Sequence, residues 1–436
     1  SLAGSDTLVT AWVLSRALEK IAPDLILCGK FSIDSETSQV PSQIAEFLDL
    51  PQVTSVRKID PGPLSHSLII ERETDEGYEQ YQLMTPGLVS VTELIIGSRR
   101  PDDGEMEVGR NKPLRTFNLE SLGIEPAMVG VTGSPTWVGE FRAAGLNRIG
   151  EVFENGNPEE AARKIASFLM LKGLFSSGLK SDNAALRPPI PLDPNLSKEI
   201  FVVVELSKGT VRRVSFELLG EAKRLAETFG AKVSAILIGG DGCEEFTKVL
   251  GAYGADTVYI ASSQELSQYR TDTYTSVIVS AITKFHPFAI FFGATTNGRD
   301  LAPRVAARLR VGLSGDCVGF ESLDGGDLAQ LKPAFGGDIV SPIFSKTTPI
   351  MATVRPGILD RLKPNWDVSP ALICLEESIS KNENLCLITH EIEPELESIA
   401  LDSAETIIGV GIGIGGPENL PLIRELSNAI GGAIGA

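Results

Sequence analysis

The apolar run Leu25-Ile-Leu-Cys28, closed by Gly29, has a counterpart in Ala289-Ile-Phe-Phe292, closed by Gly293. Each run follows a segment whose apolar residues recur at helical spacing, and each precedes a polar loop and a further helical segment. A short continuous apolar run between two helices is typical of a parallel strand that is buried on both faces. We therefore expect residues 25–28 and 289–292 to form buried parallel strands at equivalent places in two related domains.

The correspondence continues on both sides of these runs. Four landmark pairs lie 266, 264, 262 and 263 residues apart: Asp6 and Asp272, Gly29 and Gly293, Pro41 and Pro303, and Thr85 and Thr348. A drift of only four residues over such a span argues against chance matching. The predicted fold class is therefore α/β, with two related doubly wound parallel-sheet domains.

The second copy has additional elements at its front. Residues 199–204, 233–238 and 257–260 are predicted strands, and residues 216–229 and 244–253 are predicted helices. Nothing corresponding stands before Ser1 in the given sequence. A sheet without these strands would expose an edge, so we expect a chain that is cut at its front or a second polypeptide that completes the first domain.

The sequence predicts four consecutive parts. They are the first domain at 1–172, a proline-rich linker at 173–198, the second domain at 199–402 and the start of a third domain at 403–436. The second domain is expected to end in an acidic, irregular stretch from 376 to 400. The last part holds one strand, a glycine-rich turn and one helix, so the back end is expected to be cut as well.

Charge narrows the classes of partner. The chain has 436 residues, 57 of them acidic and 39 basic, for a net charge of −18. Such a field repels nucleic-acid phosphates and anionic lipid, although a local basic pocket for one nucleotide remains compatible with it. The sequence has no run of about 18 apolar residues and no secretory pattern at its start. We expect a cytoplasmic protein that binds other proteins and small molecules, with no nucleic acid and no membrane insertion.

The cysteines and histidines give no sign of catalytic chemistry. The five cysteines never occur in Cys-x-x-Cys spacing, so we interpret them as small buried apolar residues: Cys28, Cys243, Cys317, Cys374 and Cys386. Of the three histidines, only His390 has possible ligands nearby in the sequence, namely Cys386, Glu391 and Glu393. The sequence therefore predicts neither a metal site nor Ser-His-Asp chemistry, and no catalytic side chain.

The turn after the first apolar run is a candidate nucleotide site. It reads Gly29-Lys-Phe-Ser-Ile-Asp-Ser-Glu-Thr-Ser-Gln39. In an open parallel sheet, ligands lie beyond the carboxyl ends of the strands, where a helix N-terminus offers free N–H groups to a phosphate. Gly29 would allow close backbone approach, and the small hydroxyl residues Ser35, Thr37 and Ser38 suit that role. The alternative is that one of these three hydroxyls only caps the next helix.

Two further turns follow predicted strands. The turn Gly293-Ala-Thr-Thr-Asn-Gly-Arg-Asp300 is explained without a ligand if Asp300 or Asn297 caps the next helix and Pro303 lies in its first turn. In the turn at 409–416, the spacing of Gly411, Gly413 and Gly416 satisfies G-x-G-x-x-G between a strand and a helix. That turn is either a dinucleotide phosphate site or merely a tight connection.

With these residues in view, the chain resembles the electron transfer flavoproteins, in the order small (β) subunit followed by large (α) subunit. The first part carries Asp24-Leu-Ile-Leu-Cys-Gly-Lys30 and Leu50-Pro-Gln-Val-Thr54, and the second carries Gly312-Leu-Ser-Gly-Asp316 and Ala352-Thr-Val-Arg-Pro-Gly357. The resemblance covers nearly the whole chain. It implies two domains of the adenine-nucleotide-binding type and the first βα unit of a flavin-binding domain.

The resemblance also implies cofactors and the residues that bind them. The family's nucleotide loop, which holds AMP or a second FAD, falls on Gly29, Lys30, Ser32, Ile33, Asp34, Ser35, Glu36, Thr37, Ser38 and Gln39. The turn with Gly411, Gly413 and Gly416 would open the FAD domain. Two positions depart from the family pattern. Asp103 stands where the docking loop has its anchoring leucine, and Ile412 stands where the flavin turn has an arginine.

The function implied by the resemblance is an electron carrier rather than an enzyme with its own substrate. Flavin dehydrogenases would donate electrons, bound FAD would carry them, and an oxidoreductase would accept them. The departure at Asp103 questions the family's usual dehydrogenase partners. The alternative function is a nucleotide-binding assembly module of the same scaffold that lacks a working flavin, and the uncharged Ile412 favours it.

Overall fold

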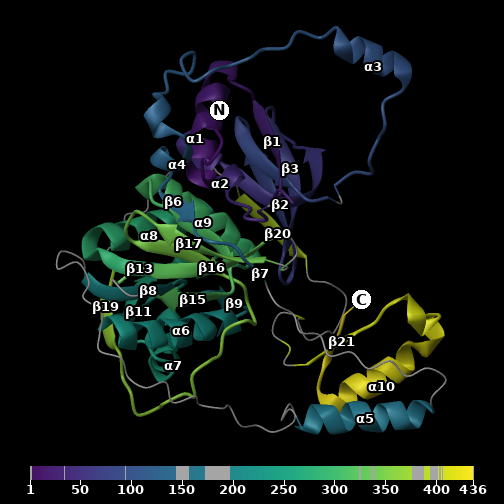
Figure 1. Cartoon of the computed structure of the whole chain (residues 1–436), viewed down its shortest axis with the longest axis vertical. Coiled ribbons are helices and arrows are strands. Elements are labelled where there is room, and N and C mark those ends of the chain that lie inside the picture. Colours follow the sequence, from purple (N-terminus) through teal and green to yellow (C-terminus); the bar gives the residue numbers. More distant parts are fainter. Residues whose placement is uncertain are drawn as a thin grey trace.

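A computed structural model gives the structure of the chain, viewed as a whole in Figure 1. It describes residues 2–33, 35–93, 95–143, 157–171, 197–323, 326–334, 337, 339–375, 387–392, 401, 404 and 406–435. Within these residues, helices and strands form two sheet-centred domains and a short C-terminal unit. None of the described helices has the length and apolar character needed to cross a membrane.

The first domain is built on a mixed sheet with the strand order β1-β5-β2-β3-β4-β20. Strands β1, β5 and β2 run parallel, and β3 and β4 continue the sheet as an antiparallel hairpin. Its main elements are α1 (Thr7–Ile21), β1 (Leu25–Gly29), α2 (Val40–Phe47), β2 (Gln52–Pro61), β3 (Ser67–Thr74), β4 (Gly77–Met84) and β5 (Gly87–Val91). Helix α1 begins where the Asp6 carboxylate accepts the backbone N–H of Val9, as expected for an N-cap.

The second domain is built on a seven-stranded parallel sheet with the order β14-β18-β13-β8-β11-β12-β19. Its strands are β8 (Ser197–Val203), β11 (Lys232–Gly239), β12 (Thr257–Ser262), β13 (Pro287–Gly293), β14 (Leu313–Cys317), β18 (Ile350–Val354) and β19 (Ala371–Cys374). Its helices are α6 (Arg213–Phe229), α7 (Thr247–Ala252), α8 (Thr271–Phe285) and α9 (Thr296–Leu309). One apolar core lies under α6 and α7 and another under α8 and α9, so both faces of the sheet are covered, as predicted.

The structure confirms the internal duplication. The strand starts of β1, β5 and β2 precede those of β13, β18 and β14 by 262, 263 and 261 residues. The hairpin β3–β4 likewise precedes the hairpin of β16 (Leu328–Ala334) and β17 (Ile339–Ser345) by 261 and 262 residues. Left-handed backbone recurs at similar separations, 264 residues between Ala22 and His286 and 261 between Ser55 and Asp316. The two domains therefore share one chain path from α1 to β5 and from α8 to β18.

Strand β1 is only partly buried, which corrects one expectation. Its central residue Leu27 is 59% exposed, whereas every residue of β13 is buried. Two differences account for this. Strand β13 lies between β8 and β18, while β1 pairs with β5 alone among the described residues. Helix α6 covers one face of β13, while the described first-domain helices that pack on β1, α1 and α2, share a core with Ile26 rather than Leu27. The parallel pairing predicted for residues 25–28 is correct, but the outer edge of this strand is open.

The two domains exchange strands. Strand β20 (Leu387–Ile392) pairs with β4 of the first domain. In return, β6 (Thr136–Val138) and β7 (Arg142–Ala143) pair with β17, next to β15 (Gly319–Ser322) and β16. The first sheet is therefore not formed by residues 1–172 alone, and residues 387–392 are a strand although the stretch around them was expected to be irregular.

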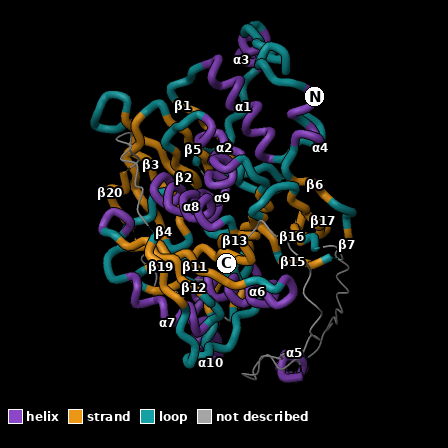
Figure 2. Tube along the Cα trace, turned by 90° about the vertical axis from the view of Figure 1, so that its left-hand side faces the viewer, coloured by secondary structure: helices purple, strands orange, loops and turns teal. Residues whose placement is uncertain are grey.

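Helices α2 and α9, which occupy equivalent places in the two copies, pack against each other between the two sheets (Figure 2). Away from this interface lie the exposed helices α3 (Asp103–Arg110) and α5 (Pro158–Leu171). The C-terminal unit consists of β21 (Ile407–Gly409), α10 (Leu420–Ile430) and β22 (Ala433–Gly435), which confirms the predicted strand–turn–helix order. The predicted linker lies almost entirely outside the described residues.

Candidate functional site

The loop after β1 folds back on itself and keeps its backbone accessible. The N–H of Lys30 donates to the carbonyl of Val91 at 3.0 Å, and the N–H of Glu36 donates to the carbonyl of Ser32 at 2.9 Å. A Cβ atom added at Gly29 would meet nothing within 4 Å, so packing does not explain this glycine. Open space at the strand end is what a ligand approaching the backbone requires. Asp34 lies outside the described residues, and Ile33 is 84% exposed.

The hydroxyl residues of this loop do not cap α2. The N-cap of α2 is Gln39, and no side chain makes a cap hydrogen bond there. Ser35 bonds Ser32 at 3.0 Å between their hydroxyl oxygens. The hydroxyl of Ser38 is shielded from solvent and has no hydrogen-bond partner, on a backbone with φ of 56°. The cap alternative is therefore wrong, and Ser38 retains an unused donor and acceptor, which is costly unless a ligand uses them.

Gln39 fastens the loop to the second domain. Its side-chain amide accepts from the Thr7 hydroxyl and donates to the carbonyl of Leu313 at 3.2 Å. A Cβ atom added at Gly315 would lie 2.6 Å from Nε2 of Gln39, so a larger residue there would have to displace this hydrogen-bonded amide. The second domain therefore holds the end of the loop in place.

A basic cluster of the second domain lies beside this loop. The Asp316 carboxylate accepts from Arg299 at 2.8 Å and from Arg355, and the ammonium group of Lys332 donates to the carbonyl of Gly315 at 2.9 Å. Burial lowers the pKa of Lys332, and the Glu36 carboxylate of the loop acts in the opposite direction. Three cationic side chains against the two carboxylates of Asp316 and Glu36 leave this corner with a net positive charge within an acidic protein.

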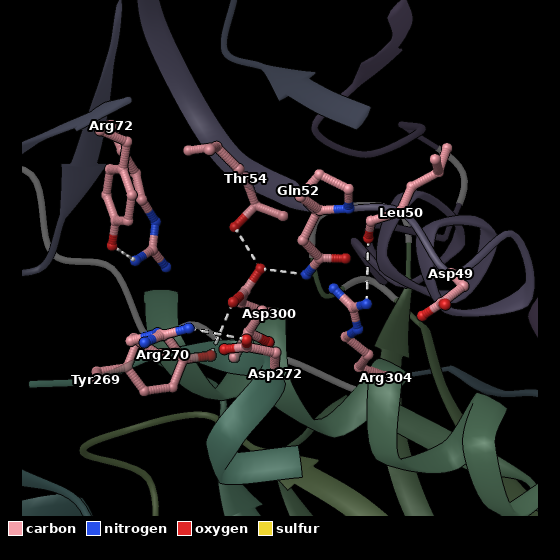
Figure 3. Close-up of a pocket in the computed structure, with 14 residues that line it drawn as sticks. Asp49, Leu50, Gln52, Thr54, Arg72, Tyr269, Arg270, Asp272, Asp300 and Arg304 are labelled. Atoms are coloured by element: carbon pink, nitrogen blue, oxygen red, sulfur yellow. Dashed lines mark hydrogen bonds and ion pairs between the residues drawn. The ribbon is translucent and has the colours of Figure 1, made fainter. Parts of the chain in front are cut away.

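The start of α9 corrects two sequence interpretations. The N-cap of α9 is Thr295, whose hydroxyl accepts the N–H of Gly298 at 3.0 Å, so neither Asp300 nor Asn297 is the N-cap. Pro303 lies inside the helix rather than in its first turn. Asp300 instead lies at the domain interface, where its carboxylate accepts hydrogen bonds from Gln52 at 2.6 Å and Thr54 at 3.0 Å of the first domain and from Tyr269 at 2.7 Å of its own domain (Figure 3).

Arg72 is the second buried charge of this interface. Its guanidinium group donates to Glu79 at 3.2 Å, to the Tyr81 hydroxyl at 3.3 Å and to the carbonyl of Thr296 at 3.3 Å. Burial alone would lower the pKa of Arg72, but the surrounding Tyr81, Asp300 and Glu79 raise it above its usual range. Arg72 therefore stays charged, and its charge ties the hairpin β3–β4 to the start of α9.

A cavity of about 90 Å³ lies between Arg72 and Asp300. Four sheltered polar atoms without hydrogen-bond partners belong to residues that line it: Nε of Arg72, Oε1 of Gln52, Nε of Arg270 and Oγ1 of Thr271. The volume suits a few water molecules and is far below the several hundred cubic ångströms of a cofactor pocket. This cavity is thus part of the domain interface, and no motif in the sequence signalled it.

The glycine-rich turn lies apart from the loop after β1 (Figure 1). Added Cβ atoms at Gly411 and Gly413 would meet nothing within 4 Å, whereas one at Gly416 would lie 2.4 Å from the Glu418 carboxylate. The side chain of Ile412 is 100% exposed. The structure therefore does not bring the two expected nucleotide sites together.

The described residues contain no group of three or more His, Cys, Asp or Glu side chains that could hold a metal ion. His390 is exposed on β20. Of the cysteines, Cys243 and Cys317 are buried as expected, but Cys374 is exposed on β19, which corrects that interpretation. Cys386 lies outside the described residues.

Two related α/β domains, one on a mixed sheet and one on a parallel sheet, define the fold class of the chain, and each has a loop at the carboxyl end of a parallel strand, where ligands bind in such folds. The sequence model described as "Electron transfer flavoprotein domain" matches residues 1–120 and 200–372, so the chain belongs to the electron transfer flavoprotein family. Membership confirms the predicted role in electron transport as a flavoprotein.

Curated relatives agree with this assignment. The chain is 37% identical over 240 residues to the electron transfer flavoprotein subunit alpha of Thermoanaerobacterium thermosaccharolyticum, which covers 55% of this chain and 72% of the relative. It is 33% identical over 247 residues to Protein FixB of Bradyrhizobium diazoefficiens, covering 55% and 66%. It is also 36% identical over 250 residues to the lactate dehydrogenase (NAD(+),ferredoxin) subunit LctC of Acetobacterium woodii, covering 56% and 58%.

Proposed function

We propose that the chain combines a small-subunit-like half, residues 1–172, with a large-subunit-like half, residues 199–402, joined by the linker at 173–198. Two observations support this division. The family model matches both halves separately, and the two domains repeat the same strand path at a constant separation. In this arrangement the interface of α2 with α9 stands in for the contact between two subunits.

We infer that the loop from Gly29 to Gln39 holds AMP or a second FAD. The observation that carries this proposal is the sheltered Ser38 hydroxyl, which has no partner although the next helix is free to use a cap. The open space at Gly29 and the nearby Lys332 and Arg355 support it, because a phosphate would meet free backbone and a positive field.

We also infer that the turn with Gly411, Gly413 and Gly416 begins the domain that binds the carrier FAD, at residues 403–436. The flavin supplies the redox chemistry, and the protein positions and tunes it. A second candidate function, a nucleotide-binding assembly module without a working flavin, is favoured by one observation. Ile412, which stands at the place of a family arginine, is fully exposed and contributes no charge to the turn.

We propose that electrons enter from a flavin dehydrogenase and leave to an electron-accepting oxidoreductase through the exposed loop that carries α3. Asp102 caps this helix in a capping box with Glu105, and Val108 is 63% exposed. Asp103 lies in the first turn of the helix, where a carboxylate interacts favourably with the helix dipole. An acidic residue here would favour a donor with a basic patch over one that offers an apolar socket.

Thermal and chemical denaturation with ligand tests the loop. A nucleotide that binds only the folded chain stabilises it by about 2.7 kcal/mol at a hundredfold excess over its dissociation constant. We expect AMP or FAD to give such a gain in the wild type. Ser38→Glu should remove the gain by bulk and like-charge repulsion, whereas Ser98→Glu, an equal change at an exposed loop position, should keep it. No ligand-dependent gain in the wild type would contradict the proposed loop site.

A further inference from the structure

A second cavity lies wholly within the second domain. It measures about 440 Å³ and is bounded by the carboxyl ends of β8, β11 and β13. In this sheet the chain runs outward in one direction from β8 through β11 to β12, and in the other direction through β13 and β18. The cavity therefore lies at the point where the strand order reverses, which is where open parallel sheets bind small molecules, and its size suits such a ligand.

The lining offers an apolar floor and a few polar groups. Phe292, Leu301 and Tyr274 supply the apolar surface. Oδ1 of Asn297, at the start of α9, is sheltered from solvent and has no hydrogen-bond partner. The exposed carboxylate of Asp241 stands at the rim, in the glycine-rich loop after β11. A ligand with a flat apolar ring and hydroxyl groups would match this lining, because an acidic residue after a strand of such a sheet accepts hydrogen bonds from ribose hydroxyls.

The anion position beside this cavity is already filled by the first domain. The Asp75 carboxylate, at the tip of the hairpin β3–β4, accepts the N–H of Thr296 at 3.1 Å and its hydroxyl at 2.7 Å, and it pairs with Arg212 at 2.7 Å. Burial alone would raise the pKa of Asp75, but Arg212 and Thr296 lower it, so the carboxylate stays ionised. Asp75 and Asn297 line one adjoining cavity of about 240 Å³. A carboxylate thus holds the helix N-terminus that a ligand phosphate would otherwise use.

We propose that the cavity of the second domain binds an uncharged nucleoside, with Asp75 occupying the place of the phosphate. The apolar floor takes the base, and Asn297 and Asp241 bind the hydroxyl groups. Phosphorylated nucleotides are disfavoured because Asp75 fills the anion position, and because the lining carboxylates of Glu205, Asp241 and Glu245 outnumber its one lysine, Lys208. This site is separate from the loop at Gly29 to Gln39, so the proposal does not depend on the proposed function.

Titration calorimetry with adenosine tests the site in the full chain carrying Ser38→Glu, so that the loop of the first domain is blocked. We expect one equivalent of adenosine to bind, and AMP to bind at least about tenfold more weakly, as one close charge repulsion costs more than 1.4 kcal/mol. Asn297→Ala should weaken the binding of adenosine by up to about tenfold, which corresponds to the loss of one hydrogen bond. Asn111→Ala, at the end of α3, should leave the affinity for adenosine unchanged.

Two further variants keep the test decisive. Asp241→Ala changes an exposed residue, so it should fold even if Asn297→Ala does not, and it should also weaken adenosine. Asp75→Asn should reduce the difference in affinity between adenosine and AMP. Absence of adenosine binding in the Ser38→Glu chain would overturn the proposal, and so would adenosine binding that both cavity variants leave unchanged.

Discussion

Replacing Asp300 by asparagine tests how the two domains are held together. The side chain of Asp300 is 4% exposed, and its two oxygens accept hydrogen bonds from Gln52, Thr54 and Tyr269. Asparagine keeps the shape and one acceptor oxygen. It places an amide group where the Tyr269 hydroxyl now donates, and it removes one of the negative charges around the buried Arg72.

We expect Asp300→Asn to cost about 3 kcal/mol of the free energy of unfolding. A hydrogen bond to a charged group contributes about 1.5–3 kcal/mol, and removal of one partner from a buried charge network costs about 3–5 kcal/mol. The retained oxygen of asparagine still accepts hydrogen bonds from Gln52 and Thr54, although these bonds are weaker because the acceptor is uncharged. The expected loss is therefore at the lower end of the range of about 3–5 kcal/mol.

Urea unfolding of the full chain, followed by circular dichroism, measures this loss. Asp272→Asn is the matched control, since it removes the same charge from a pair with Arg270 whose side chains are 26% and 34% exposed. Such a partly exposed pair contributes at most about 1 kcal/mol. Equal, small losses in the two variants would refute the idea that Asp300 and Arg72 lock the interface.

Three other expectations follow from the same structure. Gly315→Ala should lower stability by about 1–3 kcal/mol in urea unfolding, because the added Cβ would press on Gln39, and an unchanged midpoint would argue against this contact. The pKa of Asp75 is lowered in the folded state, so this carboxylate stabilises the fold above the ordinary carboxyl pKa of about 4, and the stabilisation is lost as the pH falls through the pKa of the folded state. Over that pH range Tm should therefore drop in the wild type and drop less in Asp75→Asn. Burial raises the pKa of Cys317 to about 12, so mass spectrometry after mild alkylation at neutral pH should find the exposed Cys374 modified and Cys317 intact, and the reverse order would contradict the packing.

The duplicated fold could be predicted from sequence because its signals are local. The apolar runs ending at Gly29 and Gly293 read as strands by themselves, and their constant separation reveals two copies. The exchange of β20 and β6 between the domains could not be predicted in this way. Pairing of β20 with β4 joins residues about 300 positions apart, and its acidic surroundings give no strand pattern.

The candidate site was only partly predictable, for a similar reason. The loop at Gly29 to Gln39 follows from general rules about strand ends, but Ser38 stands out only when the helix start shows no side-chain cap. The sequence interpretation of Asp300 as a helix cap is wrong, since Thr295 satisfies the same local pattern and two of the three partners of Asp300, Gln52 and Thr54, lie in the other domain. The roles of Ser38 and Asp300 depend on contacts with residues distant in the sequence, and the spacing of residues in the sequence does not reveal such contacts.

The absorption spectrum of the purified full-length protein, before and after addition of FAD and then of a reduced flavin dehydrogenase, tests the central claim most directly. An electron carrier of this family should show the flavin bands after FAD is bound, and the bands should bleach as the donor passes its electrons on. A protein that shows no flavin bands once unbound FAD has been removed by gel filtration, while AMP still stabilises it against unfolding, would contradict the carrier function and favour the nucleotide-binding assembly module instead.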